Sequence, residues 1–313
     1  MNRLLRTESL LAFSAALLFA SSWLLPEWAV FLLTLALAKG LVVLGLLLLM
    51  RAGLVSFGQG LYYAAGAYAA GIAGQMLRVT DALLMLLLAA VVSCAVAAVA
   101  GVLLAAYRGI FFAMLSLAFS MILYGLLVKT SALGSTDGFN VAVGSVAGLR
   151  LTGTATRTAL FAIAVSLACA AAVGAHRFVG SHLGRLAPAI RDNELRVEYL
   201  GASVRRVVYL NYLAAAGLSG IGGALAGLAV GHIDPEMAYW TTSGEFVFVA
   251  ILSGSASVAA PFAGAVAFEV LRSFAYQYSP NTWQLVVGLA MLLVVLFLPS
   301  GLWSLFVRRR RAP

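Results

Sequence analysis

The chain has 313 residues, of which 63% are apolar and only 10% are charged, and its mean hydropathy is +1.02. A soluble domain carries about 25% charged residues, so this composition excludes a soluble globular protein. The net charge of +9 reflects an excess of Lys and Arg. In a membrane protein these residues are retained in cytoplasmic loops, so their positions indicate the orientation of the chain. We therefore expect membrane lipid around this chain and no nucleic-acid partner.

Apolar runs of the length that crosses a bilayer follow one another along the chain. They predict one all-α polytopic integral membrane domain over residues 1–313, with about eight to ten transmembrane segments. The first run also fits a signal peptide, but no small-residue cleavage site follows it, which favours a span. In chain order the predicted apolar runs are Leu10–Leu25, Ala29–Met50, Leu54–Leu77, Ala82–Ala106, Ile110–Val128, Thr158–Ala175, Val207–Val230, Phe246–Leu252, Phe262–Ala275 and Thr282–Leu298.

The basic residues predict an orientation for these spans. With the amino terminus inside, the inner regions hold 14 Lys and Arg residues and the outer regions hold 5, which favours both termini in the cytoplasm. This count places Arg272 outside, and it requires the Gly/Ser-broken pair near residue 255 to form a hairpin rather than one crossing. It also assigns residues 131–157 to an outside loop, in which Asp137-Gly138 indicates a turn, and residues 307–313 to a basic cytoplasmic tail.

Small residues recur inside the apolar runs. Residues at every fourth position form two stripes that predict close packing between helix backbones. Cys94 and Cys169 each lie inside an apolar run, where they are expected to be small buried hydrophobes. The stripes consist of Gly66, Ala70 and Gly74, and of Gly223, Gly227 and Gly231.

The longest polar segment lies on the predicted inner side and reads SHLGRLAPAIRDNELRVEYLG over Ser181–Gly201. Pro188 suits a first helical turn and Gly201 suits a helix end. Asp192 and Arg196 have the spacing of a pair along one helix. The segment therefore predicts a short amphipathic helix at the cytoplasmic surface. Two roles are open: an interfacial anchor for the loop, or a rigid docking helix through which a soluble partner pushes on two spans.

Two apolar regions, in different halves of the chain, are interrupted by polar and glycine residues. Irregular backbone at membrane depth is tolerated only where protein or a water-filled cavity covers it. An interrupted segment in each half indicates a substrate pathway. The alternative is a loop at the membrane surface, above all for the first segment, which follows Arg51. The candidate pathway residues in these segments are Ser56, Gly58, Gln59, Ser253, Gly254 and Ser255.

Lys39 lies ten residues into an apolar run. An ionisable group inside a span is costly and by default indicates a function. Glu245 and Glu269 are candidates to neutralise it, although Arg272, one turn beyond Glu269, competes for that carboxylate. We include Lys39 and Glu245 among the pathway candidates, while a structural ion pair or snorkelling to the interface is the simpler explanation for Lys39.

No motif supplies an active site. The sequence contains no G-x-x-x-x-G-K-[ST], and neither Lys39 nor Lys129 follows a glycine, so we expect no ATP-binding P-loop. No histidine or cysteine cluster predicts a metal site, and no cofactor is expected. A transporter is therefore expected rather than an enzyme. A self-sufficient carrier, coupled to an ion through Lys39, Glu245 or Glu269, is the alternative to a subunit of a larger machine.

Taken in order, these motifs resemble the M-type permease subunit of branched-chain amino acid ABC importers, the Liv-type family that includes urea and amide permeases. The resemblance covers the chain from about Gly40 to Leu302. The sequence departs from the family at its double-glycine turn, where Ser253 stands, and at Lys39, where a small apolar residue is usual. The segments that carry the resemblance are Gly53–Gly60, Gly66–Ala70, Arg108–Leu115, Ser135–Gly138, Arg191–Glu194, Leu200-Gly201, Asp234-Pro235, Ser243, Glu245 and Phe297–Leu302.

This resemblance implies a membrane subunit of a bacterial inner-membrane importer. A second homologous permease subunit would complete a heterodimer, and a periplasmic or extracellular substrate-binding protein would deliver the solute at the side of Asp137 and Gly138. The implied solutes are branched-chain or other hydrophobic amino acids, or a small polar solute such as urea or an amide. Two ATP-binding cassette ATPase subunits would drive translocation by docking on Arg191, Asp192, Asn193, Glu194 and Gly201.

Overall fold

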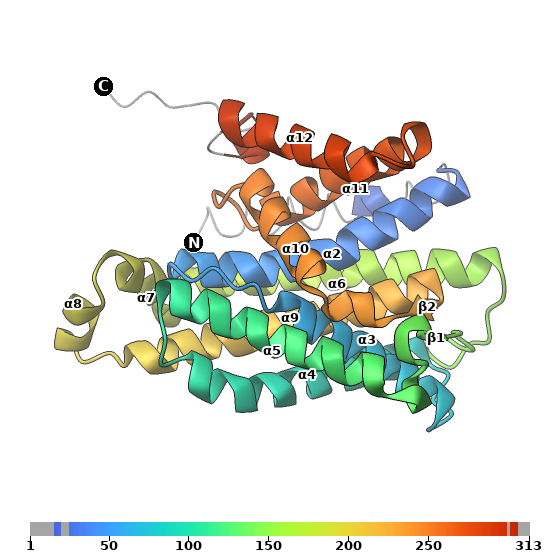
Figure 1. Cartoon of the computed structure of the whole chain (residues 1–313), viewed down its shortest axis with the longest axis horizontal. Helices are drawn as coiled ribbons and strands as arrows, with labels where there is room; N and C mark the ends of the chain where they lie inside the picture. The colour runs from blue at the N-terminus through green and yellow to red at the C-terminus, as the bar shows by residue number, and fades with distance from the viewer. Residues whose placement is uncertain (1–15, 20–24, 299–300, 306–313) are drawn as a thin grey trace.

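A computed structural model describes residues 16–19, 25–298 and 301–305 (Figure 1). Long helices account for most of these residues. Two short strands, β1 (Phe139–Asn140) and β2 (His232–Ile233), and single 3-10 turns connect them. The predicted all-α membrane fold is confirmed. The helices are α2 (Glu27–Arg51), α3 (Gln59–Gln75), α4 (Ala82–Leu104), α5 (Gly109–Lys129), α6 (Thr154–Gly180), α7 (His182–Asp192), α8 (Glu194–Tyr199), α9 (Val204–Val230), α10 (Trp240–Ser253), α11 (Ala260–Tyr278) and α12 (Trp283–Phe297).

Five of the described helices are long and apolar enough to cross a membrane, namely α2, α4, α5, α6 and α9. The predicted run Leu54–Leu77 holds a helix of only 17 residues, because α3 begins at Gln59 after a loop over residues 52–58. The helices α10, α11 and α12 have 14, 19 and 15 residues. Most of the predicted first span Leu10–Leu25, and the predicted tail 307–313, lie outside the described residues.

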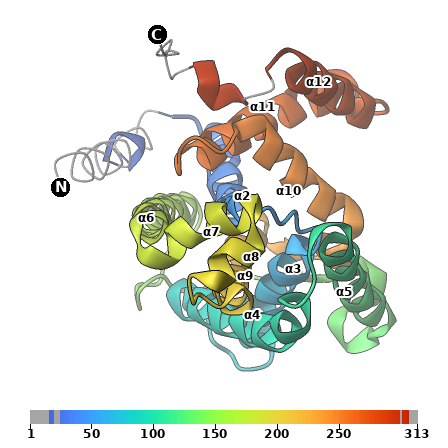
Figure 2. The same ribbon diagram turned by 90° about the vertical axis from the view of Figure 1, so that its left-hand side faces the viewer.

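The helix α2 lies at the centre of the bundle, between α6, α9 and α11 (Figure 2). Its sequence is apolar on all sides, which is the pattern of a helix that protein surrounds. Leu41, Leu44 and Leu46 are accordingly fully buried. By contrast, α4, α5 and α6 leave much of their apolar surface uncovered. Only 33%, 22% and 39% of the residues in the apolar stretches of these helices are buried. These three helices form the outside of the bundle.

Glycines bring α3 and α9 into backbone contact, as the small-residue stripes predict. A Cβ atom added at Gly66 would clash with the backbone of Gly220, and one added at Gly223 would clash with the carbonyl of Tyr63. Gly231 departs from this prediction. It ends α9 in the left-handed conformation, with a φ of +77°, rather than packing against a neighbouring helix.

The connections gather at two opposite ends of the bundle (Figure 1). The segment α7–α8 and the loop 52–58 occupy one end, which we call the α7–α8 end. The other end carries the segment 130–153 and the antiparallel pair of β1 with β2, in which Phe139 faces Ile233 and Asn140 faces His232. The segment that the sequence predicts as an outside loop, 131–157, ends earlier in the structure because α6 begins at Thr154.

The segment 181–201 forms two helices rather than the single one that its sequence predicts. Asn193 interrupts the helix with an extended backbone, and its side chain accepts a hydrogen bond of 3.0 Å from the amide of Arg196, which starts α8. Asp192 and Arg196 thus belong to different helices and do not form the predicted pair. Pro188 lies inside α7 rather than in its first turn. Gly201, with a φ of +81°, does follow the end of α8.

The helices α10 and α11 pack against each other as a hairpin, as the charge count requires. The residues between them, 254–259, lie at the α7–α8 end, because Gly254 and Ser255 line the same cavity as Pro188 and Arg191 of α7. The chain therefore returns to the opposite end through α11 before α12 begins (Figure 1).

Candidate functional site

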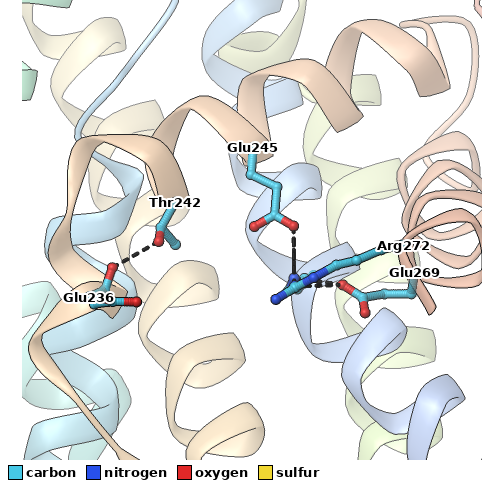
Figure 3. A network of polar contacts seen from close by, with 6 residues as sticks. Glu236, Thr242, Glu245, Glu269 and Arg272 are labelled. Carbon is cyan, nitrogen blue, oxygen red and sulfur yellow. Dashed lines mark hydrogen bonds and ion pairs between the residues drawn. The ribbon is translucent and has the colours of Figure 1, made fainter. Parts of the chain in front are cut away.

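Four charged side chains meet where α2, α10 and α11 pack together, and we call Lys39, Glu245, Glu269 and Arg272 the ion-pair cluster. Figure 3 labels the last three of them. Lys39 Nζ donates a hydrogen bond of 3.1 Å to Glu245 Oε1 and lies 2.6 Å from Glu269 Oε1. Arg272 Nη1 lies 3.3 Å from Glu245 Oε1 and 3.7 Å from Glu269 Oε1. Both carboxylates that were candidates to neutralise Lys39 therefore reach it, and Arg272 reaches both of them.

The ion-pair cluster is electrically balanced, with two cations and two carboxylates in contact. Aromatic rings support the cations, because Lys39 Nζ lies 5.8 Å from the ring centre of Phe268 and the Arg272 guanidinium lies 5.5 Å from that of Trp283. Such contacts are favourable for a cation that has lost water. The prediction that placed Arg272 outside is wrong, because this residue lies within α11 and pairs at the level of Lys39.

The first interrupted segment packs its polar groups inside the bundle. Ser56 and Gln59 are both fully buried. The Ser56 hydroxyl accepts a hydrogen bond of 3.2 Å from the amide of Gly58, and Ser116 of α5 accepts one of 3.1 Å from the amide of Phe57. Buried backbone groups need such partners. The loop is thus held in place by contacts with the protein.

The beginning of α3 is joined to two other helices. Gln59 Oε1 accepts a hydrogen bond of 2.6 Å from Ser219 of α9, and the amide of Gly60 donates one of 2.9 Å to Ser243 of α10. Gln59 Nε2 has no hydrogen-bond partner among the described residues although it is buried. Ser243 lies two residues before Glu245, so α10 connects this segment to the ion-pair cluster.

The second interrupted segment divides its residues between the interior and a cavity. Ser253 is buried and donates a hydrogen bond of 2.9 Å to the carbonyl of Ala250, so it continues α10. Gly254 and Ser255 instead line a cavity of about 560 Å³. Gly254 has a φ of +78° and closes the helix. The remaining lining residues come from α2, α7 and α10, and they are Leu47, Met50, Arg51, Pro188, Arg191, Asp192, Ala250 and Ile251.

Residues predicted for coupling and residues predicted for the pathway therefore share this cavity, in which Arg191 and Asp192 face Gly254 and Ser255. The side chain of Arg191 also packs against the backbone of Gly53, where an added Cβ atom would lie 3.1 Å from Arg191 Cγ. The helix α7 thus contacts the loop 52–58 and shares a cavity with Gly254 and Ser255 of the second interrupted segment.

A second contact ties α8 to the beginning of α5. Arg108 Nε donates a hydrogen bond of 2.6 Å to Glu194 Oε1, and Arg108 Nη1 donates one of 2.8 Å to the carbonyl of Ala105. Arg108 therefore fixes Glu194 relative to the turn between α4 and α5. Asn193 acts as the cap of α8, and Gly201 lies in the turn that leads to α9.

At the opposite end, Asp137 and Gly138 form the predicted turn, which leads directly into β1. Gly138 has a φ of +65°, and a Cβ atom there would clash with the carbonyl of Ile233. Nearby, Asp81 caps α4 and accepts a hydrogen bond of 2.7 Å from the amide of Gly148. This bond, together with the amide of Leu83, lowers the pKa of Asp81 below its ordinary value. The carboxylate therefore holds the segment 141–149 against α4.

Sequence reasoning did not single out several residues that complete these contacts. Arg108 stood only within a resembling segment, although an arginine directly after an apolar run is a signal for an anchor at the interface. Ser116 and Ser219 gave no signal, because a serine inside an apolar run is common and its partner lies far away in sequence. No group of three or more potential metal ligands occurs among the described residues.

Long apolar helices around buried polar segments define a polytopic membrane protein, and an interrupted segment in each half of the chain is typical of transporters. The chain belongs to the family described as the permease component of branched-chain amino acid transport systems, which matches residues 28–296.

Two curated relatives match a shorter region. The high-affinity branched-chain amino acid transport system permease proteins LivM of Escherichia coli K12 and of Salmonella typhimurium LT2 are each 26% identical to this chain over 143 residues. That region is 46% of this chain and 33% of each relative, so the match spans a third of their length. No solved structure matches the chain.

Proposed function

We propose that this chain is the membrane-spanning subunit of an ABC importer in the bacterial inner membrane. In this proposal it forms the translocation path with a second, homologous permease subunit, as a heterodimer. A periplasmic or extracellular substrate-binding protein delivers the solute. Two ATPase subunits supply the free energy, because no ATP-binding motif is expected in the chain itself. The solute is a branched-chain or other hydrophobic amino acid, with urea or a small amide as the wider class.

The observation that carries this proposal is the exposed surface of α8. Leu195, Tyr199 and Leu200 are 64%, 89% and 78% exposed. They lie at the α7–α8 end, outside the long apolar helices (Figure 1). Apolar side chains that stand together in water indicate a protein partner. Because Glu194 and Arg191 connect this surface to α5 and to the loop 52–58, a partner that moves α8 also moves the path.

The distribution of arginine supports the proposed orientation, with the α7–α8 end and both termini in the cytoplasm. The opposite end carries Arg78, Lys129, Arg150 and Arg157. The α7–α8 end carries twice as many basic residues among those described, which is the asymmetry of a cytoplasmic face. They are Arg51, Arg108, Arg177, Arg185, Arg191, Arg196, Arg205 and Arg206.

The alternative is an ion-coupled carrier that works alone. The ion-pair cluster disfavours it, because Lys39 already has two carboxylates and a neighbouring arginine and so offers no single exchangeable charge. The test reconstitutes the chain in liposomes with its permease partner, both ATPases and the binding protein, and measures uptake of labelled leucine, phenylalanine and urea. We expect uptake only with ATP and all components present. Uptake by the chain alone, driven by an ion gradient, would overturn the proposal.

A further inference from the structure

The ion-pair cluster has a buried side and an open side. The side chains of Lys39 and Glu269 are 9% and 8% exposed, whereas those of Glu245 and Arg272 are 21% and 39% exposed. One carboxylate and one guanidinium therefore form the open side, and a lysine and a second carboxylate lie behind them. Figure 3 shows Glu245, Glu269 and Arg272 pointing toward one another between α10 and α11.

The ion-pair cluster lies halfway along α2, one of the helices long enough to cross a membrane. Lys39 is the central residue of α2, twelve residues from either end of a helix of 25 residues. A helix of that length is about 37 Å long, and the hydrocarbon core measures about 30 Å. A charged side chain exposed to lipid at this depth is strongly unfavourable. The face that carries Glu245 and Arg272 therefore meets water or protein rather than acyl chains.

The exposed charges have the pattern of a zwitterion. Arg272 Nη1 and Glu245 Oε1 are 3.3 Å apart and together carry no net charge. An α-amino acid presents the complementary pair, because its carboxylate and its ammonium are both bonded to the α-carbon. Lys39 Nζ also donates a hydrogen bond to Glu245 Oε1, so Glu245 has a second cationic partner besides Arg272. Phe248, 56% exposed and one turn further along α10, adds apolar surface beside the charges.

We propose that Arg272 and Glu245 form a recognition pair for the zwitterionic head of an amino acid in the translocation path. The Arg272 guanidinium binds the carboxylate through two parallel hydrogen bonds, and Glu245 binds the ammonium. Lys39 and Glu269 are positioning residues for this pair. The inference rests on the proposed function and narrows its solutes to amino acids. Urea and neutral amides carry no charges, so they would leave Arg272 and Glu245 desolvated without giving either an oppositely charged partner.

The test uses a reporter cysteine at Thr241, an exposed position one turn before Glu245 on α10. It is placed in the complete transporter, with Cys94 and Cys169 replaced by alanine. The rate of labelling by a membrane-impermeant thiol reagent is measured with four solutes that share one side chain. Leucine carries both charges, 4-methylpentanoate only the carboxylate, 3-methylbutylamine only the ammonium, and 4-methylpentanamide neither. We expect leucine to protect Thr241→Cys at a concentration at least tenfold lower than the other three.

The variants Arg272→Gln and Glu245→Gln should each raise the leucine concentration for half-protection at least tenfold. Arg272→Lys, which keeps the charge but loses the paired hydrogen bonds, should give a smaller increase. The matched control is Arg157→Gln, because Arg157 forms an exposed ion pair with Glu27, with side chains 65% and 60% exposed. That control should leave the half-protection concentration unchanged.

Equal protection by all four solutes would overturn the recognition pair, and so would a cysteine that reacts only with a lipid-soluble reagent. The series of four solutes needs no change in the ion-pair cluster, so a variant that fails to fold does not decide the result. ATP-driven leucine uptake without protection at residue 241 would overturn the recognition pair and leave the proposed function standing. Protection by leucine without ATP-driven uptake would support the pair and overturn the ATP-driven role.

Discussion

Lys39 shows how one buried charge depends on residues distant in sequence. Its side chain is 9% exposed, and its two carboxylate partners lie on α10 and α11. Removing a charge from water costs several kcal/mol per ion, so a buried ion is tolerated only where its partners surround it. Replacing one member leaves the others uncompensated, which is more costly than never having buried them.

We expect Lys39→Gln to destabilise the chain by about 3–5 kcal/mol, because two carboxylates then share the single guanidinium of Arg272. The measurement is the thermal unfolding midpoint of the purified protein in detergent. Arg157→Gln, which breaks the exposed pair with Glu27, is the control and should cost about 1 kcal/mol or less. Similar shifts for the two variants would contradict the assignment of Lys39 as a buried, neutralised cation.

Single residues were predicted from the sequence only in part. The position of Lys39 inside an apolar run indicates a buried charge, and its carboxylate candidates follow from their own positions inside the membrane. The arrangement of all four charges could not be derived, because Lys39 and Glu245 are 206 residues apart. Spacing along one helix indicates contacts only within that helix.

At the scale of elements, the break at Asn193 separates two surfaces. The helix α7 lines the cavity with Arg191 and Asp192, whereas α8 presents its apolar surface to the surroundings. The signal for this break is present in the sequence, because an asparagine followed by Glu194 is typical of a helix start. Periodicity across the segment masked it, since Ile190 and Val197 are both buried and have nearly helical spacing.

The contact between Arg108 and Glu194 should transmit force between α8 and α5. We expect Glu194→Arg to uncouple ATP hydrolysis from uptake in the reconstituted transporter, because it replaces the 2.6 Å contact between Arg108 and Glu194 with two arginines that repel each other. The double exchange Arg108→Glu with Glu194→Arg restores opposite charges and should recover much of the coupling. The measurement is the ratio of solute transported to ATP hydrolysed. An unchanged ratio in Glu194→Arg would show that this contact does not couple the elements.

Asp81 provides a pH-dependent contact at the opposite end of the bundle. Its pKa is lowered in the folded chain by the amide of Gly148, so its stabilising effect is complete above the ordinary carboxyl pKa and is lost as the pH falls from there through the lowered pKa. We expect the segment 141–149 to become more accessible to protease as the pH falls from 6 to about 3. Asp81→Asn should show this accessibility already at pH 6, with a much weaker pH dependence. Equal pH profiles for the two proteins would exclude Asp81 as the cause.

At the scale of the whole molecule, charge distribution and hydrophobicity predicted different features of the fold. The count of basic residues required a hairpin near residue 255, and α10 and α11 form it. Hydrophobic runs gave the long helices within a few residues but placed α3 too early, because the loop 52–58 is as apolar as a helix yet Gly53 and Gly58 interrupt it. Buried loops of this kind are stabilised by side-chain contacts from other helices, which sequence periodicity does not contain.

The proposed orientation is tested by cysteine labelling from either side of the membrane. Tyr199→Cys on α8 and Thr136→Cys in the segment 130–153 occupy exposed positions at opposite ends. In intact cells, an impermeant reagent should label Thr136→Cys at once and Tyr199→Cys only after the membrane is opened. Adding the ATPase subunits to inverted vesicles should then slow the labelling of Tyr199→Cys. Labelling of Tyr199→Cys in intact cells would reverse the orientation and remove the docking role of α8.

The charges on α10 and α11 also bear on how the chain enters the membrane during synthesis. With 14 residues, α10 is shorter than a span, and α11 carries both Glu269 and Arg272. Each such charge opposes insertion of an isolated helix by about 2.5–3.5 kcal/mol. Lys39 lies on α2, which leaves the ribosome long before this hairpin does. We therefore expect α2 to remain near the insertion machinery and to neutralise the charges of the hairpin as it inserts. In a fragment without α2, we expect the hairpin not to insert into the bilayer.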